Sequence, residues 1–345
     1  MEERMKRYRP STKILCTVGP ASSSESVLRR MMKAGMDAVR INFSHGSRKE
    51  HLAGIETVHL LNRKYRRGIR IMGDLEGARV RVGRFGVSGQ MLLEKNRTVY
   101  MVNGPGASGK DIPFDYAGDL RDVEPAEFIY IDDGNIALRI EDVEKKRIRL
   151  KVIAGGILRE RKGINIPGAK LKFPPLRDKD REDIDFAIKN RFDYIAQSFV
   201  RSKDDILALR DYAGRESEAK VVAKIECQEG IDNIDGIMEV SDGIMIARGD
   251  MGISIPVQRV PFVQKEIIKL CRKRGRFSIT ATQMLESMTE NPFPTRAEVS
   301  DVANAVLDGT DFAMLSAETS IGRYPCACVR MMNDIIKYAE QYKPD

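Results

Sequence analysis

Apolar runs alternate with amphipathic segments along most of the chain, a pattern typical of strands that are each followed by a helix. The first strand is predicted over Lys13–Gly19, before a helix that begins at Ser24. A second strand over Ala38–Ser44 precedes a helix over Lys49–Arg67, and a third strand covers Ile69–Gly77. Since parallel strands need such crossover helices, this order indicates an α/β fold.

The pattern changes between residues 79 and 168, where apolar and polar positions alternate with a period of two, as at Ile148, Leu150 and Val152. Alternation of this kind, interrupted by glycine-containing turns, predicts short half-buried strands. We therefore expect a small all-β insertion over residues 78–168, placed after the third strand of a larger domain formed by residues 1–77 and 169–345.

The strand and helix pattern returns at Asp178. The predicted elements are then a helix through Ile188, a strand over Tyr194–Val200, a helix over Lys203–Tyr212, strands over Val221–Ile225 and Ile244–Ala247, a helix over Pro256–Lys273, a strand over Phe277–Gln283, a helix over Thr295–Leu307, a strand over Phe312–Ala317 and a helix over Tyr324–Tyr342. Eight strands with helices between them favour a (β/α)₈ TIM barrel. A doubly wound open sheet is the alternative, although the glycine fingerprint that often accompanies it is missing.

Charged residues gather where two of the buried strands end. Lys224 and Glu226 are two residues apart on one strand and therefore share a face, and Asp250 follows the next strand. Two carboxylates beside an ammonium suit a divalent metal and a phosphate, because Mg²⁺ takes few protein carboxylates and leaves its other positions to water and substrate. The glycines of Arg248–Gly252 favour an anion site, and a surface salt-bridge cluster is the alternative.

Other polar residues fall at the same end of the predicted barrel, where active sites of this fold lie. On the second strand Arg40, Asn42 and Ser44 alternate with apolar residues and would face one way, either as part of a site or as a polar layer without a catalytic role. The full set predicted at the carboxyl ends of the strands is Arg40, Asn42, Ser44, Asp74, Lys224, Glu226, Asp250, Thr282, Ser316 and Glu318.

The composition narrows the class of protein further. With 42% hydrophobic and 31% charged residues the chain can bury a substantial core. Its net charge of +8 is spread along the sequence and is accompanied by no Trp, so an anionic small substrate explains it at least as well as nucleic acid. Its five cysteines lack metal-site spacing, and neither an apolar leader nor a membrane-length run is present, so we expect a cytoplasmic protein with reduced thiols.

At these residues the chain resembles the pyruvate kinase family. The motifs that carry the resemblance are Thr12–Ser22, Arg40–Gly46, Asp132–Gly134, Gly163–Gly168, Ala223–Gly230, Asp242–Gly252, Ala281–Met288, Pro294–Gly309 and Met314–Thr319. The resemblance implies a barrel with a mobile β-barrel lid, and phosphoryl transfer from phosphoenolpyruvate to ADP. Phosphoryl transfer depends mainly on alignment and on charge placed against the reacting oxygens, which agrees with the residues at the strand ends.

The resemblance also implies roles for single residues. Glu226 and Asp250 look like ligands of Mg²⁺, or of Mn²⁺ in its place, and Lys224 with Arg40 looks like the cationic pair beside the transferring phosphoryl group. The implied substrate contacts are the backbone of Ala247, Arg248, Gly249 and Asp250, together with Thr282 and Ser316. Thr282, or water ordered by Ser316 and Glu318, would supply the proton that converts the enolate to pyruvate.

For the second substrate, the residues that resemble the family's ADP-phosphate contacts are Arg40, Asn42, His45 and Arg81. The alternative for His45 is a hydrogen bond within its own loop. The residues that resemble the family's monovalent-cation ligands are Asn42, Ser44 and Asp74.

Two departures from the family pattern change the expectations. The third strand ends Asp74-Leu-Glu-Gly-Ala-Arg79, so that Leu75 replaces a Thr near the monovalent cation, Glu76 reverses the charge of a Lys, and Arg79 replaces a Glu. A base at position 79 could put its own charge where K⁺ would sit, so we predict activity that does not require K⁺. The sequence also ends at Asp345, where family members usually continue into a further domain, so sugar-phosphate activation is not expected and a homodimer through barrel surfaces is only a hypothesis.

Three functions remain open from the sequence. The first is pyruvate kinase activity. The second is a diverged enzyme with another phosphoryl acceptor or oxo acid, suggested by the altered third strand. The third is a catalytically silent binding protein, which would have no need of Lys224, Glu226, Asp250 and Thr282 together.

Overall fold

Eight parallel strands form a closed barrel in the computed structural model, which describes residues 10–85, 89–104, 111–214 and 217–342. Predictions that concern residues 1–9 and 343–345 lie outside this part of the chain. The barrel strands are β1 (Lys13–Thr17), β2 (Ala38–Asn42), β3 (Arg70–Asp74), β12 (Tyr194–Gln197), β13 (Lys220–Ile225), β14 (Gly243–Ala247), β15 (Phe277–Ala281) and β16 (Phe312–Leu315). Closure comes from the pairing of β1 with β16, which places Lys13 opposite Phe312. The predicted TIM barrel is confirmed.

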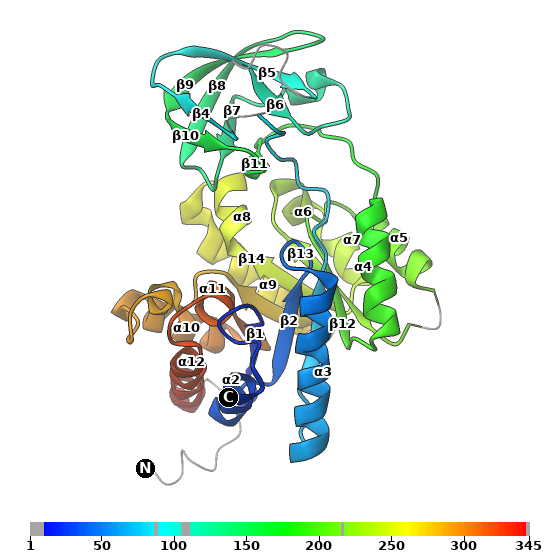
Figure 1. Cartoon of the computed structure of the whole chain (residues 1–345), viewed down its shortest axis with the longest axis vertical. Helices are drawn as coiled ribbons and strands as arrows, with labels where there is room; N and C mark the ends of the chain where they lie inside the picture. Colours follow the sequence, from blue (N-terminus) through cyan, green and yellow to red (C-terminus); the bar gives the residue numbers. More distant parts are fainter. Residues whose placement is uncertain (1–9, 86–88, 105–110, 215–216, 343–345) are drawn as a thin grey trace.

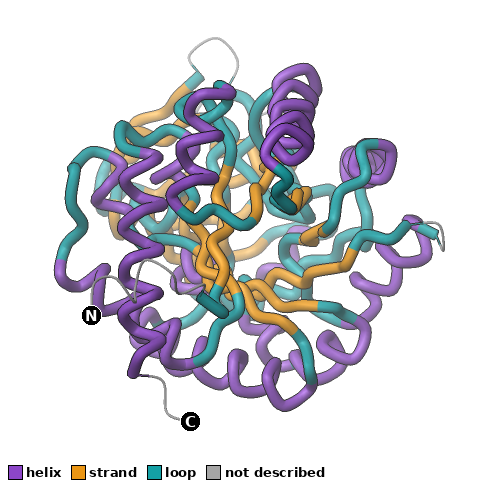
Figure 2. Tube along the Cα trace, turned by 90° about the horizontal axis from the view of Figure 1, so that it is seen from below, coloured by secondary structure: helices purple, strands orange, loops and turns teal. Residues whose placement is uncertain are grey.

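Helices lie around the strands in both views of the molecule (Figures 1 and 2). They are α2 (Glu25–Ala34), α3 (Arg48–Tyr65), α4 (Asp178–Lys189), α5 (Lys203–Ala213), α6 (Gln228–Asp232), α7 (Ile234–Val240), α8 (Arg248–Ser254), α9 (Val260–Arg274), α10 (Arg296–Asp308), α11 (Ala317–Ser320) and α12 (Pro325–Ala339). Side-chain caps begin several of them: Ser47 and Thr295 each accept a bond from a backbone N–H three residues on, inside a capping box. None of the described helices has the length and apolar character needed to cross a membrane.

The strands end earlier than the sequence pattern predicts. The predicted strands Tyr194–Val200 and Phe277–Gln283 continue past the last ladder residues, Gln197 and Ala281. The reason lies in the backbone, because Phe199 has a φ of 54° and Thr282 a φ of 76°, values that turn the chain out of the extended conformation. Candidate site residues such as Thr282 therefore lie on loops that leave the barrel, not on the strands themselves.

The described residues form three hydrophobic core clusters. The first fills the barrel interior with side chains that include Leu15, Met72, Val222, Met245 and Ile279. The second separates the strands from the surrounding helices and takes the alternate strand positions, such as Cys16 and Ile71. The third belongs to the insertion alone.

The insertion is built from β strands, as the period-two pattern predicts. Its elements are β4 (Gln90–Leu93), β5 (Thr98–Asn103), β6 (Ile112–Phe114), the 3₁₀ turn η1 (Leu120–Val123), β7 (Phe128–Ile131), β8 (Ile136–Val143), β9 (Ile148–Ala154), β10 (Gly156–Arg159) and β11 (Ile164–Asn165). Six of the strands form one sheet in the order β11-β7-β8-β9-β5-β6, and β4 pairs with β10 in a second. It forms a half-barrel lid above the end of the barrel at which the strands point (Figure 1). The two connecting segments meet in a bridge between Arg81 and Gly163.

Short elements complete the barrel and differ in detail from the prediction. One helical segment was expected between β13 and β14, and the structure divides it into α6 and α7 at Asn233. The helix expected from Pro256 begins with the 3₁₀ turn η2 (Val257–Arg259), and α9 follows at Val260. The remaining 3₁₀ turns are η3 (Glu286–Thr289) and η4 (Glu340–Tyr342).

Candidate active site

A buried charge cluster lies at the carboxyl ends of β2, β3 and β13. The Asp74 carboxylate accepts from Arg40 Nε at 2.5 Å and pairs with Lys224 Nζ at 3.1 Å. Lys224 Nζ also lies 3.3 Å from Glu226 Oε1 and donates to Ser198 Oγ at 2.6 Å. Asp74 is 1% exposed and Glu226 2% exposed. Because buried charges are tolerated only when paired, the two carboxylates and the two cations hold one another in place.

Ionisation of this cluster follows from the balance between burial and charge. Burial alone would raise the pKa of Asp74, but Arg40 and Lys224 together bring it below its ordinary value. Burial alone would lower the pKa of Lys224, but Asp74 and Glu226 raise it above its ordinary value. For Glu226, burial raises the pKa and the nearby Asp250 carboxylate adds to the rise, against the effect of Lys224. Lys224 is therefore a fixed ammonium, and Glu226 is the carboxylate that most lacks positive charge.

The Glu226 and Asp250 carboxylates are the pair in which a divalent cation would fit. Glu226 Oε2 accepts from the backbone N–H of Phe199 at 2.6 Å, which fixes its direction. Asp250 pairs with Arg79 Nη2 at 2.8 Å, so a guanidinium already stands at this carboxylate. Within the described ranges no group of three or more His, Cys, Asp or Glu side chains is arranged to hold a metal. Two carboxylates that repel each other fit Mg²⁺, which needs only one or two of them when substrate and water supply the rest.

The structure places Arg79 differently from the expectation. We expected its charge at the monovalent-cation position beside Asp74, whereas its ion pairs are with Asp250 and, at 3.3 Å, with Asp133 of the insertion. Its guanidinium also lies over the Phe199 ring, 5.7 Å from the centroid. The physical reason is that Asp74 already has two cationic partners, while Asp250 and Asp133 offer open carboxylates. Arg79 therefore connects the barrel to the Asp133 turn of the insertion.

The β14–α8 turn and the β15 loop pack against each other. A Cβ at Gly249 would lie 2.8 Å from Thr282 Cγ2, so only glycine allows this approach. The Arg248 side chain reaches the β15 loop and α10, donating to the Thr282 carbonyl at 2.7 Å and pairing with Asp301 at 2.7 Å. Thr282 is a β-branched residue with positive φ, a strained state that persists only where surrounding bonds fix it. The Arg248 side chain therefore holds Thr282 in place. The position of Arg248 in a glycine-rich motif did not predict this role.

The loop after β2 holds the other polar residues of the predicted set. Asn42 Oδ1 accepts from the Ser44 backbone N–H at 3.1 Å, and the backbone carbonyl of His45 contacts His51 Nε2 at 2.8 Å. The alternative of a hydrogen bond within the loop therefore applies to the His45 carbonyl. Burial, then the charges of Arg81 and Arg40, lower the pKa of His45 below its ordinary value. His45, Arg81 and Arg40 therefore lie close enough to influence one another electrostatically.

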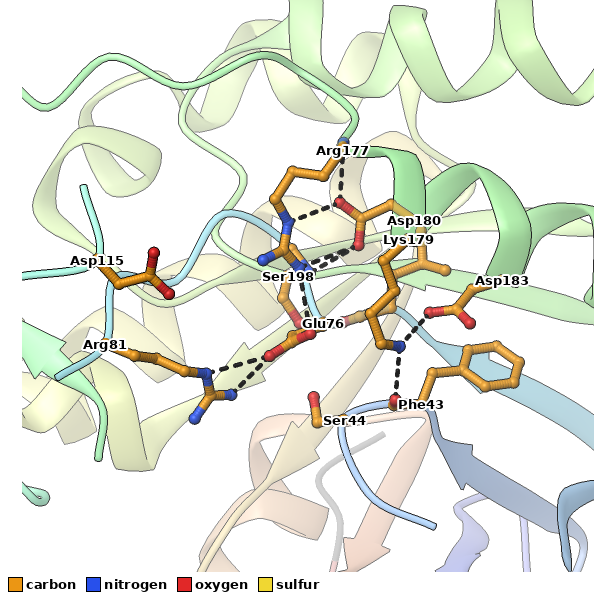
Figure 3. Close-up of polar contacts among 12 residues, drawn as sticks. Phe43, Ser44, Glu76, Arg81, Asp115, Arg177, Lys179, Asp180, Asp183 and Ser198 are labelled. Atoms are coloured by element: carbon orange, nitrogen blue, oxygen red, sulfur yellow. Dashed lines mark hydrogen bonds and ion pairs between the residues drawn. The ribbon is translucent and has the colours of Figure 1, made fainter. Parts of the chain in front are cut away.

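Helix α4 braces the loops after β2 and β3 (Figure 3). Lys179 donates to the Phe43 carbonyl at 2.8 Å and to Asp183 at 2.9 Å. Asp180 accepts from the Gly77 backbone N–H at 3.1 Å. The helical pattern that ends at Ile188 predicted only packing for α4, so its part in fixing these loops is a finding of the structure.

Ser316 directly follows β16, and Glu318 lies in the short helix α11. Glu318 is fully buried, and its carboxylate accepts backbone N–H bonds from Ser316 at 2.7 Å and from Leu285 at 3.0 Å. Burial raises the pKa of Glu318 above its ordinary value. The carboxylate therefore joins two loops and has little freedom to order a water molecule, the role that was expected for it. Ser316 remains half-buried beside it.

Three residues of the site were not predicted from the sequence. Ser198 links Asp74, Lys224 and the Leu75 carbonyl, with a bond of 2.8 Å to the last. Phe199 orients Glu226 through its backbone, and Arg177 pairs with Glu76 at 3.4 Å. The one available signal was the position of Ser198 and Phe199 at the end of a predicted strand, where site residues of this fold gather.

The fold and the site together define a (β/α)₈-barrel protein with an all-β lid after its third strand and a charged cluster at the strand ends facing it. The chain belongs to the pyruvate kinase family: the family model described as "Pyruvate kinase, barrel domain" matches residues 9–329. It is 46% identical over 335 residues to the pyruvate kinase of Staphylococcus haemolyticus and 44% identical over 333 residues to those of Staphylococcus epidermidis and Staphylococcus aureus. Each comparison covers 95% of this chain and 57% of the relative, so the chain spans a little over half the length of these relatives.

Proposed function

We propose that this chain catalyses Mg²⁺-dependent phosphoryl transfer from phosphoenolpyruvate to ADP, the pyruvate kinase reaction of glycolysis. The observation that carries the proposal is the Lys224 ammonium, which is buried and fixed by Asp74, Glu226 and Ser198 at the end of the barrel. A fixed cation in a water-poor site is what a transferring phosphoryl group requires, since the charge on its oxygens is stabilised without any rearrangement. Arg40, held by Asp74, adds a second positive charge.

Phosphoenolpyruvate would lie between Lys224 and the β14–α8 turn. We propose that the backbone from Ala247 to Asp250, with Thr282 and Ser316, holds its carboxylate, and that the close packing of Gly249 on Thr282 supports this placement. Glu226 and Asp250 would hold the divalent ion, which supplies positive charge to the phosphate and enolate oxygens. Because Glu318 is committed to backbone bonds, Thr282 is the better proton source for the enolate.

ADP would approach from the side of the β2 loop. We propose that Arg40, Asn42, His45 and Arg81 receive its phosphates, and the shared influence of Arg81 and Arg40 on His45 supports a common anion-binding region. Residues 78–168 would act as the lid domain over a barrel domain of residues 1–77 and 169–345. The Arg79 bridge between Asp250 and Asp133 supports closure of this lid against the barrel, which would keep water from the phosphoryl group.

We further propose that the activity does not require K⁺. Asn42, Ser44 and Asp74 match the monovalent-cation ligands of the family, but Asp74 is already neutralised by Arg40 and Lys224. Arg79 adds a permanent positive charge at Asp250, at the boundary between barrel and lid. Together these cations supply the charge that K⁺ would bring.

A coupled assay for pyruvate tests the proposal, with phosphoenolpyruvate, ADP and Mg²⁺ as reactants. Turnover should fall by at least about a hundredfold in Lys224→Met and in Asp250→Ala, because each removes a charge used in the transition state. Glu94→Gln is the matched control, since Glu94 forms an exposed pair with Arg97 in the insertion. Loss of activity in the control as well, or full activity of Lys224→Met, would contradict the assigned roles.

The altered third strand, with Glu76 and Arg79, favours one other function, an enzyme of this family with a different acceptor or oxo acid. Phosphate release or turnover that does not depend on ADP would support that alternative. No turnover with any phosphoenol acid would instead support a binding protein.

A further inference from the structure

Glu76 lies between two arginines that belong to the two segments joining the insertion to the barrel (Figure 3). Arg81, on the outgoing segment, donates to Glu76 Oε1 through Nε at 3.1 Å and approaches the same oxygen through Nη2 at 2.9 Å. Arg177, on the returning segment just before α4, places Nη2 3.4 Å from Oε2. Each carboxylate oxygen therefore serves one arginine, and Glu76 joins both segments to the end of β3.

The backbone that carries Glu76 is itself fixed. Gly77 donates to the Asp180 carboxylate, and a Cβ at Gly77 would lie 2.5 Å from the Ser198 carbonyl oxygen, so the chain is tightly packed there. Asp180 is 2% exposed and also accepts from the Arg177 backbone N–H and from Nε, at 3.1 and 3.2 Å. The Glu76 side chain is 13% exposed. Its carboxylate is thus a rigid anchor and not a mobile surface group.

The anchored arginine keeps two N–H groups that its described contacts do not use. Beyond its bonds to Glu76, Arg81 donates through Nη1 to the Arg161 carbonyl at 3.1 Å. In the described contacts these bonds use Nε–H and one hydrogen on each terminal nitrogen, so one N–H on Nη1 and one on Nη2 remain. Guanidinium N–H groups are strong donors to phosphate oxygens. The direction in which these two point depends on where Glu76 holds the other side of the group.

We infer that Glu76 is a positioning residue, which orients Arg81 to receive the phosphates of the nucleotide, while Arg177 supplies the second charge that keeps the Glu76 carboxylate directed between the two segments. The inference rests on the proposed function and deepens it. Without the carboxylate two guanidinium groups would face each other across one gap, and their repulsion would turn Arg81 away from its binding orientation. Glu76 does not touch the substrate in this account and acts only through Arg81.

The test compares Glu76→Gln with the parent chain in the coupled assay, in both normal and Arg81→Met backgrounds. Glutamine keeps the size of the glutamate side chain, but it presents an amide N–H donor to Arg177 in place of the carboxylate oxygen that accepted. We expect KM for ADP to rise about tenfold, equivalent to about 1.4 kcal/mol, with kcat and KM for phosphoenolpyruvate changed less than about twofold. In the Arg81→Met background the same change should leave KM for ADP as it is. Glu76→Asp, which keeps the charge but reaches less far, should give a smaller rise, and Glu94→Gln should give none.

Several outcomes would overturn the inference. An unchanged or lower KM for ADP in Glu76→Gln would show that the carboxylate is irrelevant to, or competes with, the phosphates. Equal losses for both substrates together with a lower Tm would show a purely structural role. If the parent chain makes no pyruvate, the proposed function is refuted separately from the inference. The inference is then tested by displacing fluorescent mant-ADP with ADP, and Glu76→Gln should bind ADP about tenfold more weakly than the parent chain. Equal ADP binding by the parent chain and Glu76→Gln, or no ADP binding by the parent chain, would overturn the inference.

Discussion

Replacement of Asp74 by asparagine tests whether the charge cluster is as tightly coupled as its geometry indicates. The carboxylate is 1% exposed and has three partners: Arg40 at 2.5 Å, Lys224 at 3.1 Å and Ser198 at 3.3 Å. Asparagine has the same shape, but it lacks the charge and turns an amide donor toward one of the two cations. Removal of one member of a buried ion pair costs about 3–5 kcal/mol, a large share of the roughly 5–15 kcal/mol that stabilises a typical domain.

The free energy of unfolding can be measured by urea denaturation followed by far-UV circular dichroism, since the chain has no Trp for fluorescence. We expect Asp74→Asn to lower it by about 3 kcal/mol or more. Glu25→Gln, which removes an exposed pair with Lys64, should change it by less than about 1 kcal/mol. The Asp74→Asn, Lys224→Met double variant should lose less than the sum of its single changes, because it removes a cation together with its partner. A loss below about 1 kcal/mol in Asp74→Asn would refute the coupling.

The pH dependence gives an independent check. Although burial would raise the pKa of Asp74, Arg40 and Lys224 hold it below its ordinary value. A lowered pKa in the folded state means stability that is present above the unfolded pKa and is lost as pH falls through the folded one. The difference between the parent and Asp74→Asn should therefore stay constant from about pH 8 to pH 5 and narrow only below about pH 4. A difference that disappears near neutral pH would contradict the assignment.

Three further predictions concern ligands. Because burial and Asp250 raise the pKa of Glu226, Mn²⁺ binding measured by calorimetry should begin to weaken, as pH falls, above the ordinary glutamate pKa of 4.5; affinity that stays constant down to that pH would contradict this. Gly249→Ala should raise KM for phosphoenolpyruvate by about tenfold, since its methyl group displaces Thr282; an unchanged KM would show that this contact does not affect binding. Arg79→Glu should acquire activation by K⁺ of about tenfold at fixed ionic strength, against less than about twofold in the parent; equal activation of both would sink the proposal for Arg79.

The barrel itself was predictable because most positions of its strands are apolar and buried, whichever face they lie on. Ile71 packs toward the helices and Met72 into the barrel, and both positions demand apolar residues. The all-β character of the insertion was equally clear from its period of two. What local patterns did not show was the short α8 immediately after β14 and the break at Asn233, since elements of five to seven residues carry too few periods to be recognised.

Positions of candidate site residues followed from the fold, because parallel strands bring their carboxyl ends together whatever the loops do. Lys224 and Glu226 meet as expected, and Asp74 joins them from the neighbouring part of the barrel. The partner that Arg79 chooses could not be foreseen in the same way. A long side chain on a connecting segment reaches carboxylates on several elements, and its choice depends on which of them are already neutralised.

Competition between charged groups for partners also links the roles of Glu76 and Arg177. Position 76 carries a carboxylate in place of a base, and the Asp180 carboxylate of α4 is a like charge nearby. The guanidinium of Arg177 pairs with both carboxylates and so separates them. With Arg177 present the sequence Arg81, Glu76, Arg177, Asp180 alternates in sign, so the reversal at Glu76 is compensated within four residues. A charge reversal therefore need not disrupt the site, provided that the new carboxylate still directs Arg81 toward the loop after β2.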